Sequence, residues 1–233
     1  MAGKTTLTSS KNKQIVFFDW NGTFIDDEVA TVEAFREVLR GVKHPKATLS
    51  IEELSALHAE VFEIPLSKMY DKIGFSDEQK RLAAEEHYWA ESYNKAVASI
   101  KTHTGILETI EILENHGIDF GILSNHTASD IEAKLLSFGF SDIPILANDH
   151  SGQSHIQGKL HRIEKYQTSN PYIEVIAIIG DSVEEVEIAK SIKSISIAFS
   201  NGWVRENRIK SANPDYLIDS SELPSVITTI VSA

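Results

Sequence analysis

Cysteine does not occur among the 233 residues of the chain. Its absence excludes disulfide bonds, thiolate nucleophiles and cysteine-ligated zinc sites, and it is typical of proteins in a reducing compartment. The chain also lacks an apolar run long enough to cross a bilayer, and its N-terminal stretch MAGKTTLTSSKNKQ has no apolar segment of the kind that signal peptides carry. We therefore expect a soluble, cytoplasmic protein.

Basic residues are scarce as well, since 22 lysines and arginines face 34 aspartates and glutamates and leave a net charge of -12. Nucleic acids and anionic membranes both require clustered positive charge, so neither is an expected partner. A chain of this length with 42% hydrophobic residues can bury the core of one large domain and still hold a smaller insertion. An anionic substrate would have to be bound by a local group of charges.

The first half of the chain divides into a short lead-in and a helical block. Residues 1–13 are small, polar and basic, and we expect a flexible segment there. Residues 28–103 show apolar residues at helical spacing and no strand pattern, which predicts an all-helical insertion. Two capping-box signals mark helix starts in this block, Ser50 with Glu53 and Ser76 with Gln79.

Residues 14–27 and 104–233 carry the remaining pattern, in which apolar strands alternate with helices. Strands are predicted at Ile15 to Phe18, Ile118 to Leu123, Ile143 to Ala147, Val175 to Ile179, around Ile195, and at Tyr216 to Ile218. Alternation of this kind favours right-handed crossovers and a parallel sheet. The predicted fold class is therefore α/β, with these two ranges together forming the sheet core.

The most informative motif is QIVFFDWNGTFIDD, in which an apolar run ends at Asp19 and is followed by Asn21, Gly22 and Thr23. A buried parallel strand reads as such a run, and the chemistry of open α/β sheets lies just beyond the carboxyl ends of the strands. The segment EVIAIIGD repeats the design and ends at Asp181. Two carboxylates at one sheet edge can hold a hard cation, and Mg²⁺ is commonly bound by one or two carboxylates together with substrate phosphate. The pair indicates phosphoryl chemistry.

Four sequence elements in chain order resemble the haloacid dehalogenase superfamily, whose members mostly transfer phosphoryl groups through an aspartyl-phosphate. They are Asp19 with Asn21 and Thr23, Ser124 after the apolar GIL, Lys159 at a helix start, and Asp181 with Glu185. The resemblance extends over the chain after residue 13 and places the block 28–103 where that family has its cap domain. It implies a Rossmann-like parallel sheet core with an inserted all-helical cap domain and an active site between the two.

The resemblance also implies roles for individual residues. Asp19 would be the nucleophile, because a carboxylate that becomes phosphorylated splits one hard displacement into two easier ones. Thr23 would bring a hydroxyl close to it. Ser124 and Lys159 would bind the transferring phosphoryl group as hydrogen-bond donor and cation, and Asn125 would also contact the substrate.

Mg²⁺ is the cofactor that the resemblance implies. Its ligands would be the carboxylates of Asp19 and Asp181, the backbone carbonyl of Asn21, and the acid at position 185. The family usually has aspartate at that last position, so whether Glu185 reaches the metal directly or through water stays open. By analogy with the family's specificity loop, the cap residues expected nearest the substrate are Phe62, Pro65, Lys68, Tyr70 and Lys72.

Asn21 departs from the family pattern, because the phosphatases usually carry there an aspartate that acts as general acid and then as general base. Asparagine cannot exchange a proton in this way, so a contribution of roughly 10²–10⁴ to the rate is in question. The protein could be a slow phosphatase, could favour leaving groups that need no proton, or could receive the proton from a cap histidine.

Two likenesses within the superfamily bear on the substrate. Asp-Trp-Asn-Gly-Thr with its paired acids, followed later by Asp149-His150 and Gly158-Lys159, resembles bacterial phosphoglycolate-phosphatase-like members. The same motif is close to the Asp-Trp-Ala-Gly-Thr of phosphonoacetaldehyde hydrolases, in which a cap lysine forms a Schiff base. Lys68 and Lys72 lie in the cap but do not match that lysine motif.

The predicted function is Mg²⁺-dependent hydrolysis of a small phosphorylated metabolite, a phosphate monoester, by a monomer or homodimer. A phosphonatase-like hydrolase of C–P bonds is one alternative. A catalytically impaired protein that binds a phosphorylated ligand is the other, and Asn21 is the residue that supports it.

Overall fold

A computed structural model of the chain describes residues 13–63, 66–86, 88–149 and 158–232. Six strands form one sheet in the order β5-β4-β1-β6-β7-β8, and every neighbouring pair is parallel. Their bounds are β1 Lys13–Phe18, β4 Asp119–Thr127, β5 Ile145–Asn148, β6 Ile173–Gly180, β7 Ile195–Phe199 and β8 Tyr216–Ile218. The predicted α/β fold with a parallel sheet is confirmed, and β1 lies in the middle of the sheet.

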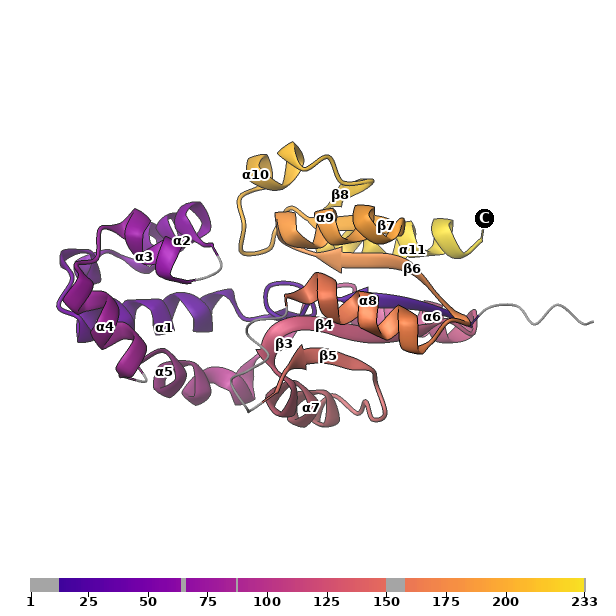
Figure 1. The fold of residues 1–233 in the computed structure, drawn as a ribbon, viewed down its shortest axis with the longest axis horizontal. Coiled ribbons are helices and arrows are strands. Elements are labelled where there is room, and N and C mark those ends of the chain that lie inside the picture. Colours follow the sequence, from indigo (N-terminus) through magenta and orange to yellow (C-terminus); the bar gives the residue numbers. More distant parts are fainter. Residues whose placement is uncertain (1–12, 64–65, 87, 150–157, 233) are drawn as a thin grey trace, which may run out of the picture.

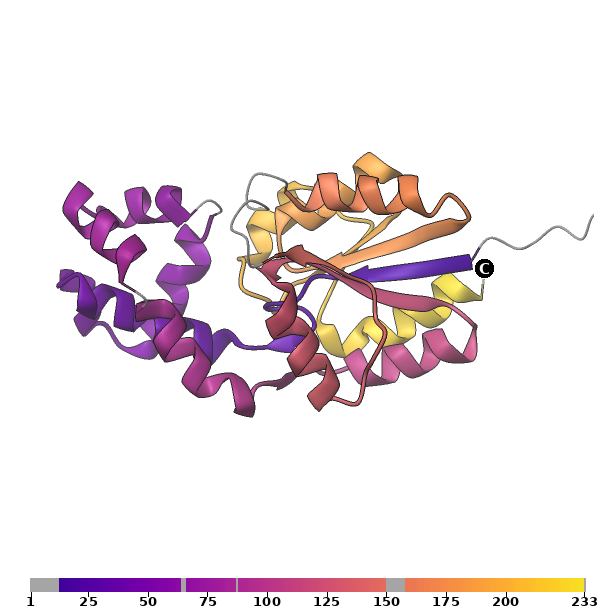
Figure 2. The same ribbon diagram turned by 60° about the horizontal axis from the view of Figure 1, so that its bottom comes forward.

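Helices cover both faces of this sheet (Figure 2). Side chains of β1 alternate, so that Val16 and Phe18 join one apolar cluster while Ile15 and Phe17 join another. The first cluster includes residues of α6 (Ile106–Asn115), α7 (Ala128–Ser137) and α11 (Leu223–Val231). The second includes residues of α8 (Lys159–Ser169) and α9 (Val183–Ile192). A strand buried on both faces explains why β1 reads as a continuous apolar run.

The helical insertion follows β2 and forms one end of the molecule, away from the C-terminus (Figure 1). Its helices are α1 Glu28–Gly41, α2 Ile51–Val61, α3 Leu66–Ile73, α4 Asp77–Glu85 and α5 Tyr88–Ala96, with short 3₁₀ turns at Pro45–Thr48 and Val97–Ser99. It has an apolar cluster of its own, centred on Phe35, Leu39 and Leu54. Both predicted capping boxes are present at Ser50 and Ser76.

Two short strands were not expected from the sequence. β2 (Ile25–Asp26) pairs antiparallel with β3 (Lys101–Thr102), and no strand was predicted at either position. Strands of two residues are too short to show alternation, which is the physical reason for the wrong prediction. The pair joins the two ends of the insertion.

The remaining elements complete the sheet side. α10 (Glu206–Ser211) packs with α9 through Val186 and Ile209, and a 3₁₀ turn at Ser220–Glu222 precedes α11. Among the helices that the structure describes, none combines the length and the apolar character that a membrane crossing requires.

Phe24→Ala tests the apolar core next to the loop that follows β1. Its side chain is fully buried and lies 5.3 to 6.5 Å, centroid to centroid, from the rings of Trp20, Phe120, Phe138 and Phe140. We expect Phe24→Ala to lower the free energy of unfolding by about 3–5 kcal/mol, because it leaves a cavity that this ring cluster cannot close. Urea denaturation measures the change.

The control is Leu136→Ala on α7, where the side chain is 58% exposed. Its unfolding free energy should stay within about 0.5 kcal/mol of the wild-type value. Equal losses in the two variants would show that Phe24 is not a core residue.

Candidate active site

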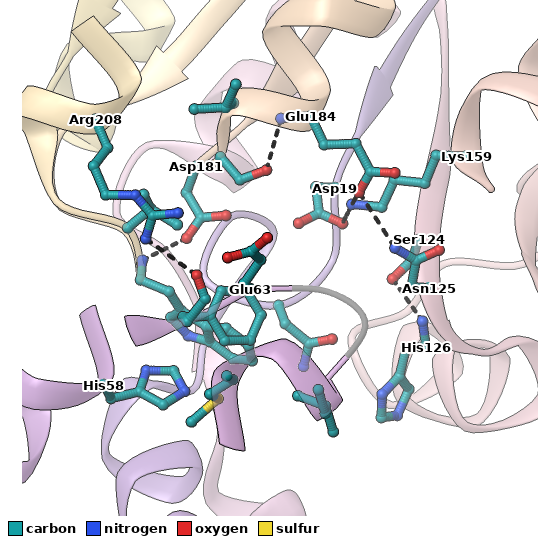
Figure 3. A pocket seen from close by; sticks show the side chains of 18 of the residues that line it. Asp19, His58, Glu63, Ser124, Asn125, His126, Lys159, Asp181, Glu184 and Arg208 are labelled. Atoms are coloured by element: carbon teal, nitrogen blue, oxygen red, sulfur yellow. Dashed lines mark hydrogen bonds and ion pairs between the residues drawn. The ribbon is translucent and has the colours of Figure 1, made fainter. Parts of the chain in front are cut away.

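The topology brings three strand ends together. β4, β1 and β6 are neighbours in the sheet. Asp19 and Asp181 follow the last residues of β1 and β6, and Ser124 lies near the carboxyl end of β4. The backbone of Asp19 continues the ladder by donating a hydrogen bond from its N–H to the carbonyl of Ile179 over 2.8 Å. Figure 3 shows these side chains pointing into one pocket. Residues more than 100 positions apart in the sequence are thereby placed side by side.

Lys159 connects the carboxylates of this pocket. It is the first residue of α8, and its Nζ lies 2.8 Å from Asp19 Oδ1 and pairs with Glu185 Oε1. Glu184 Oε2 is 3.9 Å from the same nitrogen. Lys159 is only 5% exposed, so its pairs with the buried Asp19 and Glu185 have little screening by water, whereas the side chain of Glu184 is 41% exposed.

Burial and charge shift the pKa values of the group in opposite directions. Burial raises the pKa of Asp19 to about 7, although the charge of Lys159 opposes the shift. Burial by itself would lower the pKa of Lys159, but the charges of Asp19 and Glu185 raise it above its ordinary value. Burial also raises the pKa of Asp181 well above its ordinary value. Three buried carboxyl groups thus share one lysine, and the raised pKa values of Asp19 and Asp181 reflect the cost of ionising all three without a further cation.

A hard cation fits this cluster. One carboxylate oxygen from each of Asp19, Asp181 and Glu185 lies within 4.8 Å of the others, and all three residues are buried. Carboxylate oxygens are the donors that magnesium prefers. Glu185 has a further task, since Oε1 pairs with Lys159 and Oε2 accepts from the Ser182 hydroxyl at 2.5 Å. Burial would raise the pKa of Glu185, but these two partners hold it below its ordinary value.

Asp27 fixes the side chain of Asn21 through a hydrogen bond. The Asn21 amide donates to Asp27 Oδ2 over 2.7 Å and to the Tyr93 hydroxyl oxygen over 3.0 Å. Asp27 also accepts from the Tyr93 hydroxyl at 2.6 Å and from Trp203 Nε1 at 3.1 Å. Burial raises the pKa of this carboxyl group. The sequence analysis missed Asp27, Tyr93 and Trp203; the second acid of Ile-Asp-Asp was the one available signal.

Gly22 and Thr23 shape the loop after β1. Gly22 has φ +70°, and a Cβ there would lie 2.6 Å from Asp181 Oδ2 and 2.7 Å from Trp203 Cδ1. Only glycine combines this backbone conformation with so close an approach. Thr23 is fully buried with its hydroxyl 3.5 Å from Asp181 Oδ1, so it supports the acid cluster from below.

Ser124 and Asn125 are positioned by Arg162, which the sequence analysis also missed. Arg162 donates to the Ser124 carbonyl over 2.8 Å and to Asn125 Oδ1 over 3.2 Å. The Ser124 hydroxyl oxygen accepts from the backbone N–H of His126 at 3.0 Å, which leaves its proton free to face the pocket. Arg162 lies one helical turn after Lys159 on α8, and that spacing could have suggested a shared task.

The cap side closes the pocket, a cavity of about 580 Å³ whose lining includes Phe62 and Tyr70. Lys68 and Lys72 are not among its described lining residues. They pair instead with Glu63, at 3.2 and 2.6 Å, and remain 59% and 44% exposed. Pro65 lies outside the described residues. The substrate contacts suggested for this loop stay predictions.

Lys159→Met tests the charge balance of the cluster. We expect the free energy of unfolding at pH 8 to fall by about 3–5 kcal/mol, because buried carboxylates lose their cation. Burial raises the pKa of Asp19 in the folded protein to about 7, whereas in the unfolded chain it is about 4. The free energy of unfolding therefore falls as the pH rises between these two values. Removing the lysine raises this pKa further, so the substitution should lower the free energy of unfolding less at pH 5 than at pH 8. Urea denaturation in EDTA measures both.

Lys165→Met, on the exposed side of the same helix, is the matched control. It should change the free energy of unfolding by less than about 0.5 kcal/mol at either pH. A loss for Lys159→Met that is larger at pH 5 than at pH 8 would contradict the charge argument.

Comparisons with known proteins agree with this architecture. The chain is 21% identical over 215 residues to the protein named "Probable phosphatase IndB" of Dickeya dadantii, which covers 89% of this chain and 90% of that protein. A predicted phosphatase from Clostridium acetobutylicum has a TM-score of 0.70 at 20% identity, covering 95% of this chain and 99% of that one. A predicted phosphoglycolate phosphatase from Haemophilus somnus has a TM-score of 0.69 at 16% identity, covering 93% and 99%.

At these identities the solved structures show a shared fold. The family model described as haloacid dehalogenase-like hydrolase matches residues 13–193, which is most of the chain and includes the loop after β1, Lys159 and both acids of the segment after β6. The chain belongs to the haloacid dehalogenase-like hydrolase family.

Proposed function

We propose that the protein is a Mg²⁺-dependent phosphatase that hydrolyses a small phosphate monoester through an aspartyl-phosphate on Asp19. The observation that carries this proposal is the buried contact of 2.8 Å between Lys159 Nζ and Asp19 Oδ1 at the base of the 580 Å³ cavity. The lysine opposes the rise in pKa that burial imposes on Asp19, and so favours the charged carboxylate. A charged carboxylate is what an attack on phosphorus requires.

The chain's own residues account for two displacements. A carboxylate oxygen of Asp19 attacks phosphorus as the bond to the alcohol oxygen breaks, and water then cleaves the aspartyl-phosphate to release inorganic phosphate. Lys159 and the Ser124 hydroxyl bind the phosphoryl oxygens during both. Asp19, Asp181 and the backbone carbonyl of Asn21 would hold Mg²⁺, with Glu185 beside them. When bound, the metal offsets the negative charge of the phosphate.

Proton transfer to the leaving oxygen is the weak step. Asn21 has no acidic proton, and its amide is already engaged with Asp27 and Tyr93. His58 lines the pocket from the cap, but burial lowers its pKa to about 4, so it is uncharged at neutral pH. This counts against His58 as the acid. It supports slow turnover of ordinary alcohol esters and faster turnover of esters whose leaving group needs no proton.

The two alternatives differ in support. A phosphonatase needs a cap lysine in the pocket, whereas Lys68 and Lys72 point their charges at Glu63. A protein that binds a phosphorylated ligand without turnover is favoured by Asn21 alone. Turnover measurements separate this second candidate from the phosphatase.

Asp19→Asn is the direct test of the nucleophile. Phosphate release from p-nitrophenyl phosphate in the presence of Mg²⁺ should fall by at least about 10³-fold, because the amide cannot form the covalent intermediate. EDTA should abolish the wild-type activity, and added Mg²⁺ should restore it. Asp77→Asn on the exposed first turn of α4 should retain full activity. Binding of inorganic phosphate without release from any ester would instead favour the ligand-binding candidate.

Asn21→Asp tests the missing acid. Its new carboxyl group would lie beside Asp27, so the two would share a proton that can be donated at neutral pH. We expect kcat/KM for an alkyl phosphate to rise by about ten-fold or more, while kcat/KM for p-nitrophenyl phosphate, whose leaving group needs no proton, changes little.

The matched control is Asn201→Asp, an exposed substitution outside the pocket lining that should change neither value. If Asn21→Asp raised kcat/KM equally for both esters, proton donation to the leaving group would not be the limiting feature.

A further inference from the structure

The cavity above Asp19 is much larger than a phosphoryl group. Its volume is about 580 Å³, within the range of roughly 300–1,000 Å³ that pockets for drug-sized ligands have. The strand ends occupy one side, and α1, α2 and α3 of the insertion form the other (Figure 3). The alcohol part of the substrate is therefore enclosed together with its phosphate, and the cap-side walls decide what it is.

These walls combine several aromatic rings with the aliphatic side chains of Val38, Leu66 and Met69. The ring of Phe62 meets the ring of Trp203 edge to face, with centroids 5.3 Å apart at an angle of 88°. Phe35 stands 5.6 Å from the His58 ring on the same side. Tyr70 and Trp89 extend the surface. Aromatic walls in such arrangements favour a planar ring over a short polar chain, because a ring can stack and also bury apolar area.

His58 adds a polar side chain to this surface. The residue is 2% exposed, and among the residues that the structure describes its Nε2 has no hydrogen-bond partner. A buried nitrogen without a partner is costly, and native structures rarely keep one without a reason. His58 lines the cavity from α2, so a bound molecule can supply the missing partner.

We infer that the substrate is a phosphate monoester whose alcohol carries a planar ring, with a polar ring atom that pairs with His58. The inference rests on the proposed function for the position of the phosphate, and it goes beyond it by naming the class of alcohol. Phosphoglycolate, which is short and has no ring, is outside this class.

Benzyl phosphate and ethyl phosphate provide the first test, because their alkoxide leaving groups have similar basicity. The ratio of their kcat/KM values then reports contacts in the pocket. We expect benzyl phosphate to be preferred by about ten-fold or more, mostly through a lower KM. Phosphoglycolate should be a poorer substrate than benzyl phosphate. Equal values for the benzyl and ethyl esters, or a preference for phosphoglycolate, would overturn the inference.

Variants assign the preference to residues. Phe62→Ala removes one wall and should reduce the benzyl preference by about three-fold or more. His58→Phe keeps a ring in place and removes the nitrogens. At least one of the three pyridylmethyl phosphates should exceed benzyl phosphate by about 3–10-fold in the wild type and lose that gain in His58→Phe. A gain that survives this substitution would overturn the role of His58. Tyr172→Ala, 77% exposed just before β6, should leave every ratio unchanged.

A binding experiment separates this inference from the proposed function. Benzylphosphonate and ethylphosphonate cannot be hydrolysed as esters, and calorimetry in Mg²⁺ gives their affinities without turnover. If no ester releases phosphate but benzylphosphonate binds about ten-fold more tightly, the phosphatase function fails and the ring pocket stands. If esters are hydrolysed but the two phosphonates bind equally, the ring pocket fails and the phosphatase stands.

Discussion

The buried pairing of Lys159 with Asp19 and Glu185 is the interaction on which the site depends. Parallel strands bring Asp19 and Asp181 to one edge, but closely spaced carboxylates repel one another and lose their hydration on burial. The positive charge of Lys159, the first residue of α8, offsets this repulsion. Glu185 reaches both Lys159 and Ser182. Its side chain has room because residue 180 is a glycine, and a Cβ at that position would overlap it.

A second set of contacts joins the insertion to the sheet. Asp27 immediately precedes α1, and its carboxylate receives hydrogen bonds from Tyr93 on α5 and from Trp203 in the loop after β7. Arg208 of α10 donates to the carbonyl of Phe62, where α2 ends. Large movements of the insertion would therefore break bonds that also hold the loop containing Asn21. Position of the cap and placement of Asn21 are linked through one carboxylate.

The fold was predictable from the sequence because its strongest signals are local. Continuous apolar runs mark the central strands, and the capping boxes at Ser50 and Ser76 are visible as spaced residue pairs. Motifs at strand ends also pointed to Asp19 and Asp181, which the sheet topology brings together. Their catalytic and metal-binding roles stay predictions, since geometry shows proximity and charge but not turnover.

The parts that escaped prediction depend on tertiary packing. Trp203 follows β7 by several residues, and nothing in its local sequence reveals that its indole N–H reaches Asp27. Arg162 resembles any helix-surface arginine until α8 is packed against β4. β2 and β3 have no periodicity of their own, and they exist because the ends of the insertion meet. Each of these features joins segments that are far apart in the chain.

Asn21 is best understood together with Asp27 and not as the loss of one acid. An aspartate at position 21 would put a second carboxylate 2.7 Å from Asp27, inside a site where burial already raises the Asp27 pKa. The asparagine amide instead donates to that carboxylate, so Asp27 can stay buried and keep its bonds to Tyr93 and Trp203. Asparagine thus stabilises the joint between cap and sheet at the position where the family's phosphatases place their proton donor. In this chain the geometry favours a firmly held cap contact at position 21, and under the proposed function the selection of substrate would rest on the leaving group and on the walls of the cavity.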